Sequence, residues 1–262
     1  MSWIEIAILI VSGVLVGFIN TLAGGGTVIS FSVFMFGVGL PADIANGTNR
    51  IAVAIQNIVS VVSFRKQKIL DFRKAITLAI PAVIGSVLGA KIAVDINEEA
   101  IRISIGIVML IMLFFILYNP EKWLKGQPDI LEKKISIKLW ILFFIIGIYG
   151  GYVHVGVGYF LLSAIVLGAG YDVVKGNAIK SFIVLAYTPA SLLVFMLEGK
   201  VNYQYGLVHS IGNVIGAYYA SKYAVTWGAG FVRWVIVTVI IIFASDLLGI
   251  IDLKMLIGEF VK

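Results

Sequence analysis

The chain has 262 residues, of which 60% are hydrophobic and only 13% are charged. A soluble domain carries about twice that share of charged residues, so the composition excludes an ordinary soluble protein. The formal net charge is +6 and the chain has no cysteine, which excludes disulfides, thiolate catalysis and iron–sulfur ligation.

Apolar segments follow one another along the whole chain. A membrane span needs about 20 mostly apolar residues, because the hydrocarbon core of a bilayer is about 30 Å thick. In the first half we expect helices at residues 4–22, 27–40, 44–64, 73–94 and 100–118. In the second half we expect helices at residues 137–152, 157–170, 173–197, 203–224 and 230–250. The sequence therefore predicts an all-α polytopic membrane protein.

A polar linker near the middle carries Pro120 and Pro128, which break helices. It divides the chain into a first transmembrane repeat, a cytoplasmic linker and a second, inverted transmembrane repeat, at residues 1–118, 119–136 and 137–262.

The two halves resemble each other at a nearly constant offset, close to half the length of the chain. Three pairs of stretches match in order: 43–48 with 172–177, 83–85 with 214–216, and the glycine-rich 23–26 with 154–158. Such a duplication is typical of secondary transporters. Because each copy has five segments, an odd number, the second copy is expected upside down in the bilayer. The predicted fold is two inverted repeats of about five transmembrane or re-entrant helices each.

The charges of the loops support this orientation. Loop 64–74 and the linker are rich in lysine and arginine, which the positive-inside rule assigns to the cytoplasm. Loop 95–99 is acidic and loop 198–202 is nearly neutral, so both are expected outside. This predicts a multi-pass protein of the inner membrane with both termini external.

Two of the predicted segments are short. Residues 27–40 would extend only about 21 Å as a helix. Residues 4–40, and likewise 137–170, therefore either span the membrane fully or form re-entrant hairpins.

Glycine-rich breaks interrupt both repeats at matched positions, at residues 20–27 and 150–158. A broken backbone at membrane depth is tolerated only where protein or a water-filled cavity surrounds it. A helix that restarts at Thr27 would present unpaired N–H groups and a positive dipole end, which favour an anion. The alternative is close helix packing through small residues.

Ionisable residues lie within two of the apolar helices. Arg50 and Lys180 are each about 9 Å from the start of their segment, and they enter from opposite faces. Charged groups at this depth usually face a cavity or a partner. The alternative is that these long side chains reach back to the headgroups. We predict substrate contacts from both breaks and both helices, at Asn20, Thr21, Gly24, Gly25, Gly26, Thr27, Asn46, Thr48, Asn49, Arg50, Gln56, Tyr152, His154, Asn177, Lys180 and Ser181.

The two histidines, His154 and His209, fall in different segments, so we expect no metal site. His154 is either a packed, hydrogen-bonded residue or a proton carrier. We expect no cofactor and no catalytic residues. Nucleic acid is not an expected partner, because a binding patch would have to lie on the basic loops alone. The expected partners are a small anionic substrate and the lipid bilayer, and a homodimer is left open.

The motifs 23–27 and 45–50, the turn ending at 68–71 and the helix with Gly85 and Gly89 resemble the TauE/SafE sulfite exporter family, also called the toluene sulfonate uptake permease family. The resemblance covers nearly the whole chain. It implies a transporter of small sulfur-containing or organic anions such as sulfite, sulfonates or sulfoacetate. The second half departs from the family's small-residue pattern, with Gly176-Asn177-Ala178 in its place.

A secondary anion transporter is therefore the predicted function, with the site near the bilayer midplane between the repeats. A passive anion channel is the main alternative, because inverted repeats also build channels. An intramembrane enzyme would need a nucleophile, a metal set or paired catalytic carboxylates, and the sequence displays none of these.

Overall fold

The computed structural model describes residues 1–96, 99–100, 103–104, 131 and 135–247. The predicted segment 100–118 and the linker 119–136 lie mostly outside the described residues. In the first half the structure has α1 Trp3–Leu22, α2 Thr27–Ser32, the π-helix η1 Val33–Gly37, α3 Ala42–Lys66 and α4 Phe72–Asp95. In the second half it has α7 Ile137–Tyr152, α8 Val157–Ser163, the π-helix η2 Ala164–Gly168, α9 Val173–Leu197 and α10 Tyr203–Leu247.

All regular structure in these residues is helical, as the sequence predicts. Three of the described helices are long and apolar enough to cross a membrane, namely α1, α4 and α9. The combined stretch of α2 and η1 is short, Thr27–Gly37, and so is that of α8 and η2, Val157–Gly168. Eleven or twelve helical residues reach about 16–18 Å, too little to span hydrocarbon.

The order of elements is the same in both halves. Equivalent helices begin at a nearly constant offset, as with Thr27 and Val157, or Ala42 and Val173. Even the π-helices recur, at the same point after each short helix. Because π-helical turns are rare, their recurrence at one offset supports the internal repeat.

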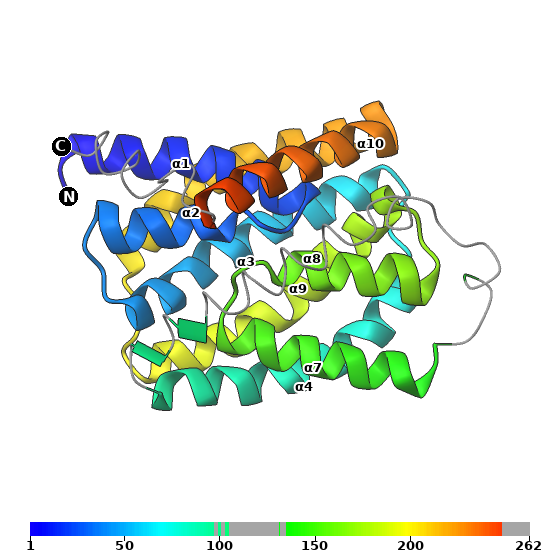
Figure 1. Ribbon diagram of the computed structural model, residues 1–262, viewed down its shortest axis with the longest axis horizontal. Helices are drawn as coiled ribbons and strands as arrows, with labels where there is room; N and C mark the ends of the chain where they lie inside the picture. The colour runs from blue at the N-terminus through cyan, green and yellow to red at the C-terminus, as the bar shows by residue number, and fades with distance from the viewer. Residues whose placement is uncertain (97–98, 101–102, 105–130, 132–134, 248–262) are drawn as a thin grey trace.

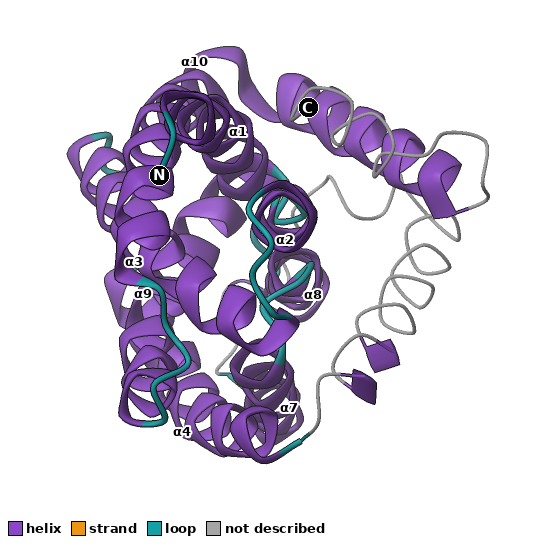
Figure 2. Cartoon of the chain, turned by 90° about the vertical axis from the view of Figure 1, so that its left-hand side faces the viewer, coloured by secondary structure: helices purple, strands orange, loops and turns teal. Residues whose placement is uncertain are grey.

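The helices form a bundle with a matched pair of helices on each of two opposite sides. Viewed along the helices, α1 packs on α10 on one side and α4 packs on α7 on the other (Figure 2). Helices α3 and α9 lie between these pairs. The short helices α2 and α8 lie on the same face of the bundle in Figure 2, and Figure 1 shows them one beyond the other along its length. Each pair joins the first α-helix of one repeat to the fourth described α-helix of the other.

The helix directions are consistent with an inverted repeat. Gly13 approaches His209 and Gly17 approaches Asn213, so α1 and α10 run parallel. Helix α1 also runs in the same general direction as α3 (Figure 1), and the Thr21 and Ser60 hydroxyls near their carboxyl ends lie 3.1 Å apart. Helix α4 follows α3 after a short turn and returns in the opposite direction (Figure 1). Helix α4 therefore opposes α1, whereas its counterpart α10 runs with it.

Pairs of glycines four residues apart bring the matched helices close together. A Cβ on Gly17 or Gly216 would press against backbone across the α1–α10 contact. A Cβ on Gly89 or Gly151 would do the same across the α4–α7 contact. This is the small-residue packing that membrane helices commonly use.

The last predicted pair of segments is corrected by the structure. Residues 203–224 and 230–250 were predicted as separate helices, but α10 is one 45-residue helix, Tyr203–Leu247. A straight helix of that length would reach about 68 Å. Its ribbon instead changes direction partway along (Figure 1). Gly228 and Gly230, which fall at the predicted break, are accommodated without interrupting the helix.

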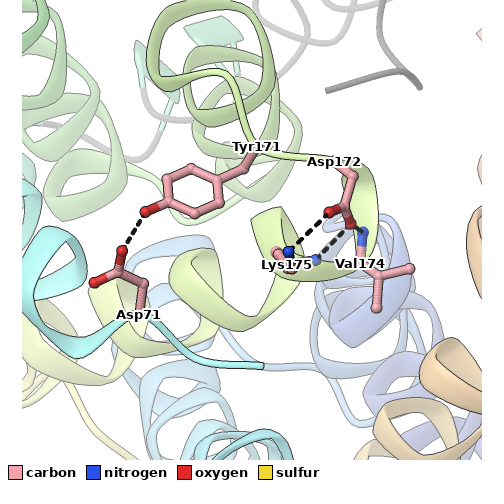
Figure 3. A network of polar contacts seen from close by, with 5 residues as sticks. All are labelled: Asp71, Tyr171, Asp172, Val174 and Lys175. Atoms are coloured by element: carbon pink, nitrogen blue, oxygen red, sulfur yellow. Dashed lines mark hydrogen bonds and ion pairs between the residues drawn. The ribbon is translucent and has the colours of Figure 1, made fainter. Parts of the chain in front are cut away.

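The predicted cytoplasmic loops share one end of the bundle. The Tyr171 hydroxyl, just before α9, donates to Asp71 at the start of α4, at 2.5 Å (Figure 3). Lys74 donates to the carbonyl of Leu131, which belongs to the predicted linker. At the opposite end Lys200 lies 3.4 Å from Asp43. The basic turn and Leu131 of the linker are thus at the same end of the bundle, as the charge pattern predicts.

Candidate functional site

The two glycine breaks meet in the middle of the bundle. Gly24 has φ of +89°, a conformation that L side chains rarely adopt. Its backbone lies against Gly158 of the other break, so that a Cβ on either glycine would contact the backbone of the other. Gly25 faces Tyr159, whose hydroxyl would lie 2.7 Å from an added Cβ. The two repeats therefore touch where both are interrupted.

The carboxyl end of α1 is held by two side chains of α9. Lys180 Nζ donates to the carbonyls of Asn20 and Thr21, both at 2.9 Å, and to Asn177 Oδ1 at 2.6 Å. Asn177 Nδ2 donates to the carbonyl of Leu22 at 2.8 Å. We call Asn177 and Lys180 the α1-end clamp. All three ammonium protons of Lys180 have acceptors, which suits a cation at a helix carboxyl end.

The carboxyl end of α7 is held in the same way by α3. Arg50 donates to the carbonyls of Gly150, at 3.1 Å, and Gly151, at 2.5 Å. Asn46 Nδ2 donates to the carbonyl of Tyr152 at 2.8 Å, and its Oδ1 accepts from Arg50 at 3.2 Å. We call Asn46 and Arg50 the α7-end clamp. Each clamp thus crosses from one repeat to the first helix of the other.

The contacts of the clamps show whether the two intramembrane cations face the protein interior or the headgroups. Arg50 is 0% exposed and Lys180 is 2% exposed, so neither reaches back to the headgroups. Their charged ends point into the protein and bind helix carbonyls. Each helix end carries about half a negative charge, so the two ends offset about one of the two positive charges. No Asp or Glu side chain is buried in the described part of the chain. A net positive charge remains inside.

One sequence-based expectation about the first break is wrong. The N–H of Thr27 was predicted to be unpaired, but it donates to Asn20 Oδ1 at 3.1 Å. The Thr27 hydroxyl donates to the same oxygen at 3.3 Å. The side chain of Asn20 therefore caps α2 and occupies the position that an anion was expected to take at Thr27.

A small cavity lies where the breaks, α3 and α9 come together. Its volume of about 10 Å³ holds about one water molecule. Five predicted site residues, drawn from both repeats, line it: Asn20, Gly24, Gln56, His154 and Lys180. The other lining residues are Val53, Asn57, Val157, Gly158 and Val184.

Several buried polar atoms of α3, α8 and α9 have no hydrogen-bond partner among the described residues. They include Gln56 Oε1 in the cavity wall and both amide atoms of Asn49. Asn49 is seven residues before Gln56, so the two share a face of α3. The hydroxyls of Tyr159 and Ser181 are in the same condition. An unpartnered buried polar group is costly, so these atoms call for a water or a ligand.

The remaining predicted residues are placed away from the cavity wall. The Thr21 hydroxyl pairs with Ser60, and the Thr48 hydroxyl accepts from the N–H of Asn202 at 2.8 Å. The hydroxyl of Tyr152 lies 2.9 Å from Ser104 Oγ. Gly26 packs beneath α1, where an added Cβ would lie 2.7 Å from the Val16 carbonyl. Arg50, Asn46 and Asn177 belong to the clamps, and Asn49 and Ser181 are buried without partners.

Five lining residues were not among the predicted site residues. Val53 and Val184 are related by the same offset as Ala42 and Val173, so they occupy equivalent places in the two repeats. The offset between the repeats could have shown that these two valines are equivalent, but an apolar side chain does not indicate a ligand site. Asn57 was visible as a polar residue in an apolar helix. Its Nδ2 donates to the carbonyl of Val53 at 2.8 Å.

Sequence similarity to known proteins is independent evidence on the family of this chain. The sequence model of the sulfite exporter TauE/SafE family matches residues 9–247, which is nearly the whole chain. The chain belongs to the TauE/SafE family. A probable membrane transporter protein ORF9 of a Sinorhizobium species is 26% identical over 93% of this chain and 92% of its own. No solved structure matches the chain.

Two further TauE/SafE-like relatives are similar over comparable lengths. A probable membrane transporter protein of Haemophilus influenzae is 25% identical over 88% of this chain and 90% of its own. The probable membrane transporter protein YfcA of Escherichia coli K12 is 24% identical over 95% of this chain and 91% of its own. With its apolar spanning helices, the protein is a membrane transporter of the TauE/SafE family.

Proposed function

We propose that this TauE/SafE protein is a secondary transporter of a small oxyanion, either sulfite or a sulfonate such as sulfoacetate. The substrate would bind between the repeats, where the two glycine breaks meet. The observation that carries the proposal is the excess of buried positive charge beside a cavity that both repeats line. Arg50 and Lys180 are buried, and no buried carboxylate balances them in the described residues.

The chemistry of the cavity wall agrees with an oxyanion. Lys180 supplies charge at the wall, and the NH2 groups of Gln56 and Asn57 are amide donors there, with Asn57 using one of its two N–H bonds on the Val53 carbonyl. A sulfonate or sulfite group has three oxygens, which can accept from several such donors together. The name of the family, sulfite exporter, supports sulfur oxyanions among the small anions.

The small volume of the cavity also supports transport over passive conduction. A space for about one water cannot hold sulfite, so the site must widen before a substrate enters. The glycine breaks are the natural place for this change, because they join the repeats with little side-chain interlocking. Alternating access in repeat transporters moves one repeat against the other around a central site.

The test is flux through the purified protein in proteoliposomes, with a set of radiolabelled or fluorescently detected anions. Sulfite, methanesulfonate, sulfoacetate, sulfate and chloride would be compared, with sodium and an amino acid as controls. We expect saturable uptake of sulfite or a sulfonate, with competition among the sulfur oxyanions. Flux of a cation alone would refute the proposal. Flux that fails to saturate and carries current would establish the channel instead.

We also propose that the basic end of the bundle faces the cytoplasm and that both termini are external. The chain has no cysteine, so single cysteines can be introduced as labels. A cysteine at Lys66 should react only from the cytoplasmic side, and one at Ser2 or Asn202 only from outside. Reactivity of Lys66 and Asn202 sites from the same side would contradict this orientation.

A further inference from the structure

His154 is a buried titratable group at the centre of the proposed site. It lies in the second glycine break, between α7 and α8, and is 4% exposed. Its ring lines the same cavity as Lys180 and Gln56. Its Nδ1 is 3.0 Å from the hydroxyl of Tyr187 on α9. The charge of Arg50 also acts on the ring.

The ionisable groups around this ring have an unusual balance. Helix α3 contributes Arg50, and α9 contributes Lys180 and Tyr187. Helix α7 contributes Tyr149, whose hydroxyl donates to the carbonyl of Val155 next to His154, and α1 contributes the amide of Asn20 in the cavity wall. None of these groups is a carboxylate. A proton on His154 would therefore be a third positive charge in a region that already has two.

We propose that His154 is the binding site of a proton that is carried together with the anion. This inference rests on the proposed function, since it needs a bound anion. With the cavity empty, an imidazolium would have only Arg50 and Lys180 as charged neighbours among the described residues. With an oxyanion in the cavity, the added positive charge is balanced at short range. Anion binding and proton binding therefore strengthen each other, and this coupling is necessarily reciprocal.

The hydrogen bonding of the ring suits the two protonation states. A neutral imidazole has one donor and one acceptor nitrogen, and Nδ1 can take either role towards the Tyr187 hydroxyl. A protonated imidazole donates from both nitrogens. The oxygen of Tyr187 can accept from Nδ1, and the backbone of Gly150 is a second hydrogen-bond partner of the ring. Neither partner carries a charge, so an oxyanion in the cavity would balance the charge of the imidazolium, and no covalent step is involved.

His209 provides a matched comparison within the same molecule. It is equally buried, at 0% exposed, but it is held between α1, α2 and α10. Its Nδ1 is 2.8 Å from the Leu9 carbonyl, and its Nε2 is 3.0 Å from Ser30 Oγ. Both ring nitrogens are thus paired, and His209 is not part of the cavity wall. A proton linked to the anion is expected at His154 and not at His209.

The experiment counts protons taken up when an anion binds to the purified full-length protein. The probe is methanesulfonate, which does not itself bind protons near neutral pH. Calorimetric titrations in two buffers of different ionisation enthalpy give the number of protons taken up per anion. We expect net uptake approaching about one proton in the wild type around neutral pH. His154→Gln should reduce it to about zero, whereas His209→Gln should leave it unchanged.

Two further measurements keep the result interpretable. His154→Asn is a second variant in case the glutamine variant misfolds, and size-exclusion profiles establish that each variant is folded. Proton uptake that persists in folded His154 variants would overturn the inference, as would wild-type binding without any proton uptake. Absence of methanesulfonate binding to the wild type would also overturn it. That last result counts against the proposed function only if the liposome assay shows no anion flux either.

Discussion

The two clamps follow one plan but use different cations, and the difference separates their roles. Arg50 makes four hydrogen bonds and its guanidinium lies 4.5 Å from the centre of the Phe195 ring. Lys180 makes three hydrogen bonds and lines the cavity, whereas Arg50 is not part of the cavity wall. The planar guanidinium is suited to fixing several acceptors at once. We interpret the α7-end clamp as the more rigid of the two and the α1-end clamp as the one nearer the proposed substrate site.

The largest expected effect is a loss of stability when the α7-end clamp is disrupted. Arg50→Gln leaves the carbonyls of Gly150 and Gly151 without their charged donor, and it also removes the bond to Ser191 Oγ. Hydrogen bonds to charged groups contribute about 1.5–3 kcal/mol each, so we expect a loss of about 3 kcal/mol or more in unfolding free energy. Unfolding of the detergent-solubilised protein by heat or denaturant measures it.

The exposed Arg73 provides the control for this loss. Arg73→Gln removes the same charge at the surface, and we expect a change within about 0.5 kcal/mol. Arg50→Lys should recover part of the stability, because an ammonium has three donors for the four acceptors. Equal stability of Arg50→Gln and Arg73→Gln would contradict the role of Arg50 as a clamp.

The next largest effect is a loss of anion uptake when the α1-end clamp is changed. Lys180→Gln removes a charge that lines the cavity, so we expect anion uptake to fall by at least about tenfold. Its unfolding free energy should fall less than that of Arg50→Gln, because three hydrogen bonds are affected and not four. Uptake is measured per amount of folded protein in liposomes. Wild-type uptake by Lys180→Gln would show that the lysine only holds α1.

Much of the fold is predictable because membrane helices leave strong patterns. The segment 44–64 corresponds to α3, Ala42–Lys66, and the segment 173–197 matches α9, Val173–Leu197. The apolar runs fix these helices, and the side chain of Asp172 fixes a start by accepting from backbone N–H groups of α9. The repeat was predictable because matched motifs recur at one offset.

The partners of the buried cations were not predictable in the same way. Arg50 and Lys180 bind backbone carbonyls that lie in the opposite half of the chain, such as those of Gly150 and Thr21. Every residue has a carbonyl, so no residue type signals such a partner. Only the crossing of the repeats reveals which helix end each cation meets. The bond from the Thr27 N–H to Asn20 was missed for a related reason, since a capping amide and a ligand-binding amide look alike in sequence.

A smaller effect tests whether the two clamps act separately. Asn46→Ala and Asn177→Ala each remove one donor and one acceptor, so each should cost about 1–3 kcal/mol. A double-mutant cycle between Asn177 and Lys180 should give a coupling energy of about 0.5–3 kcal/mol, because they touch. The cycle between Asn46 and Lys180 should give a coupling near zero. Strong coupling in the second cycle would mean that the clamps form one network.

The smallest expected effect concerns the residues that cap the starts of α4 and α10. Asp71 accepts from the backbone N–H of Lys74 at the start of α4, at 3.1 Å. Its counterpart in the second repeat, Asn202, accepts from the N–H of Tyr205 at the start of α10, at 3.2 Å. Asp71→Asn therefore gives the first repeat the neutral cap of the second.

Burial alone would raise the pKa of the Asp71 carboxyl, but hydrogen bonds outweigh it. The bond from Tyr171, the backbone N–H groups and the charge of Lys74 together lower this pKa below its ordinary value of 3.8. A lowered pKa means that the charged form stabilises the folded state above about pH 4. That contribution is lost as the pH falls through the folded-state pKa.

Since neutral asparagine is also a good cap, we expect Asp71→Asn to cost less than about 1 kcal/mol at pH 7. The difference between wild type and variant in unfolding free energy should shrink as the pH is lowered from 5 to 3. A difference that stays constant over this range would show that the carboxylate charge of Asp71 has no part in holding α4 against the loop before α9.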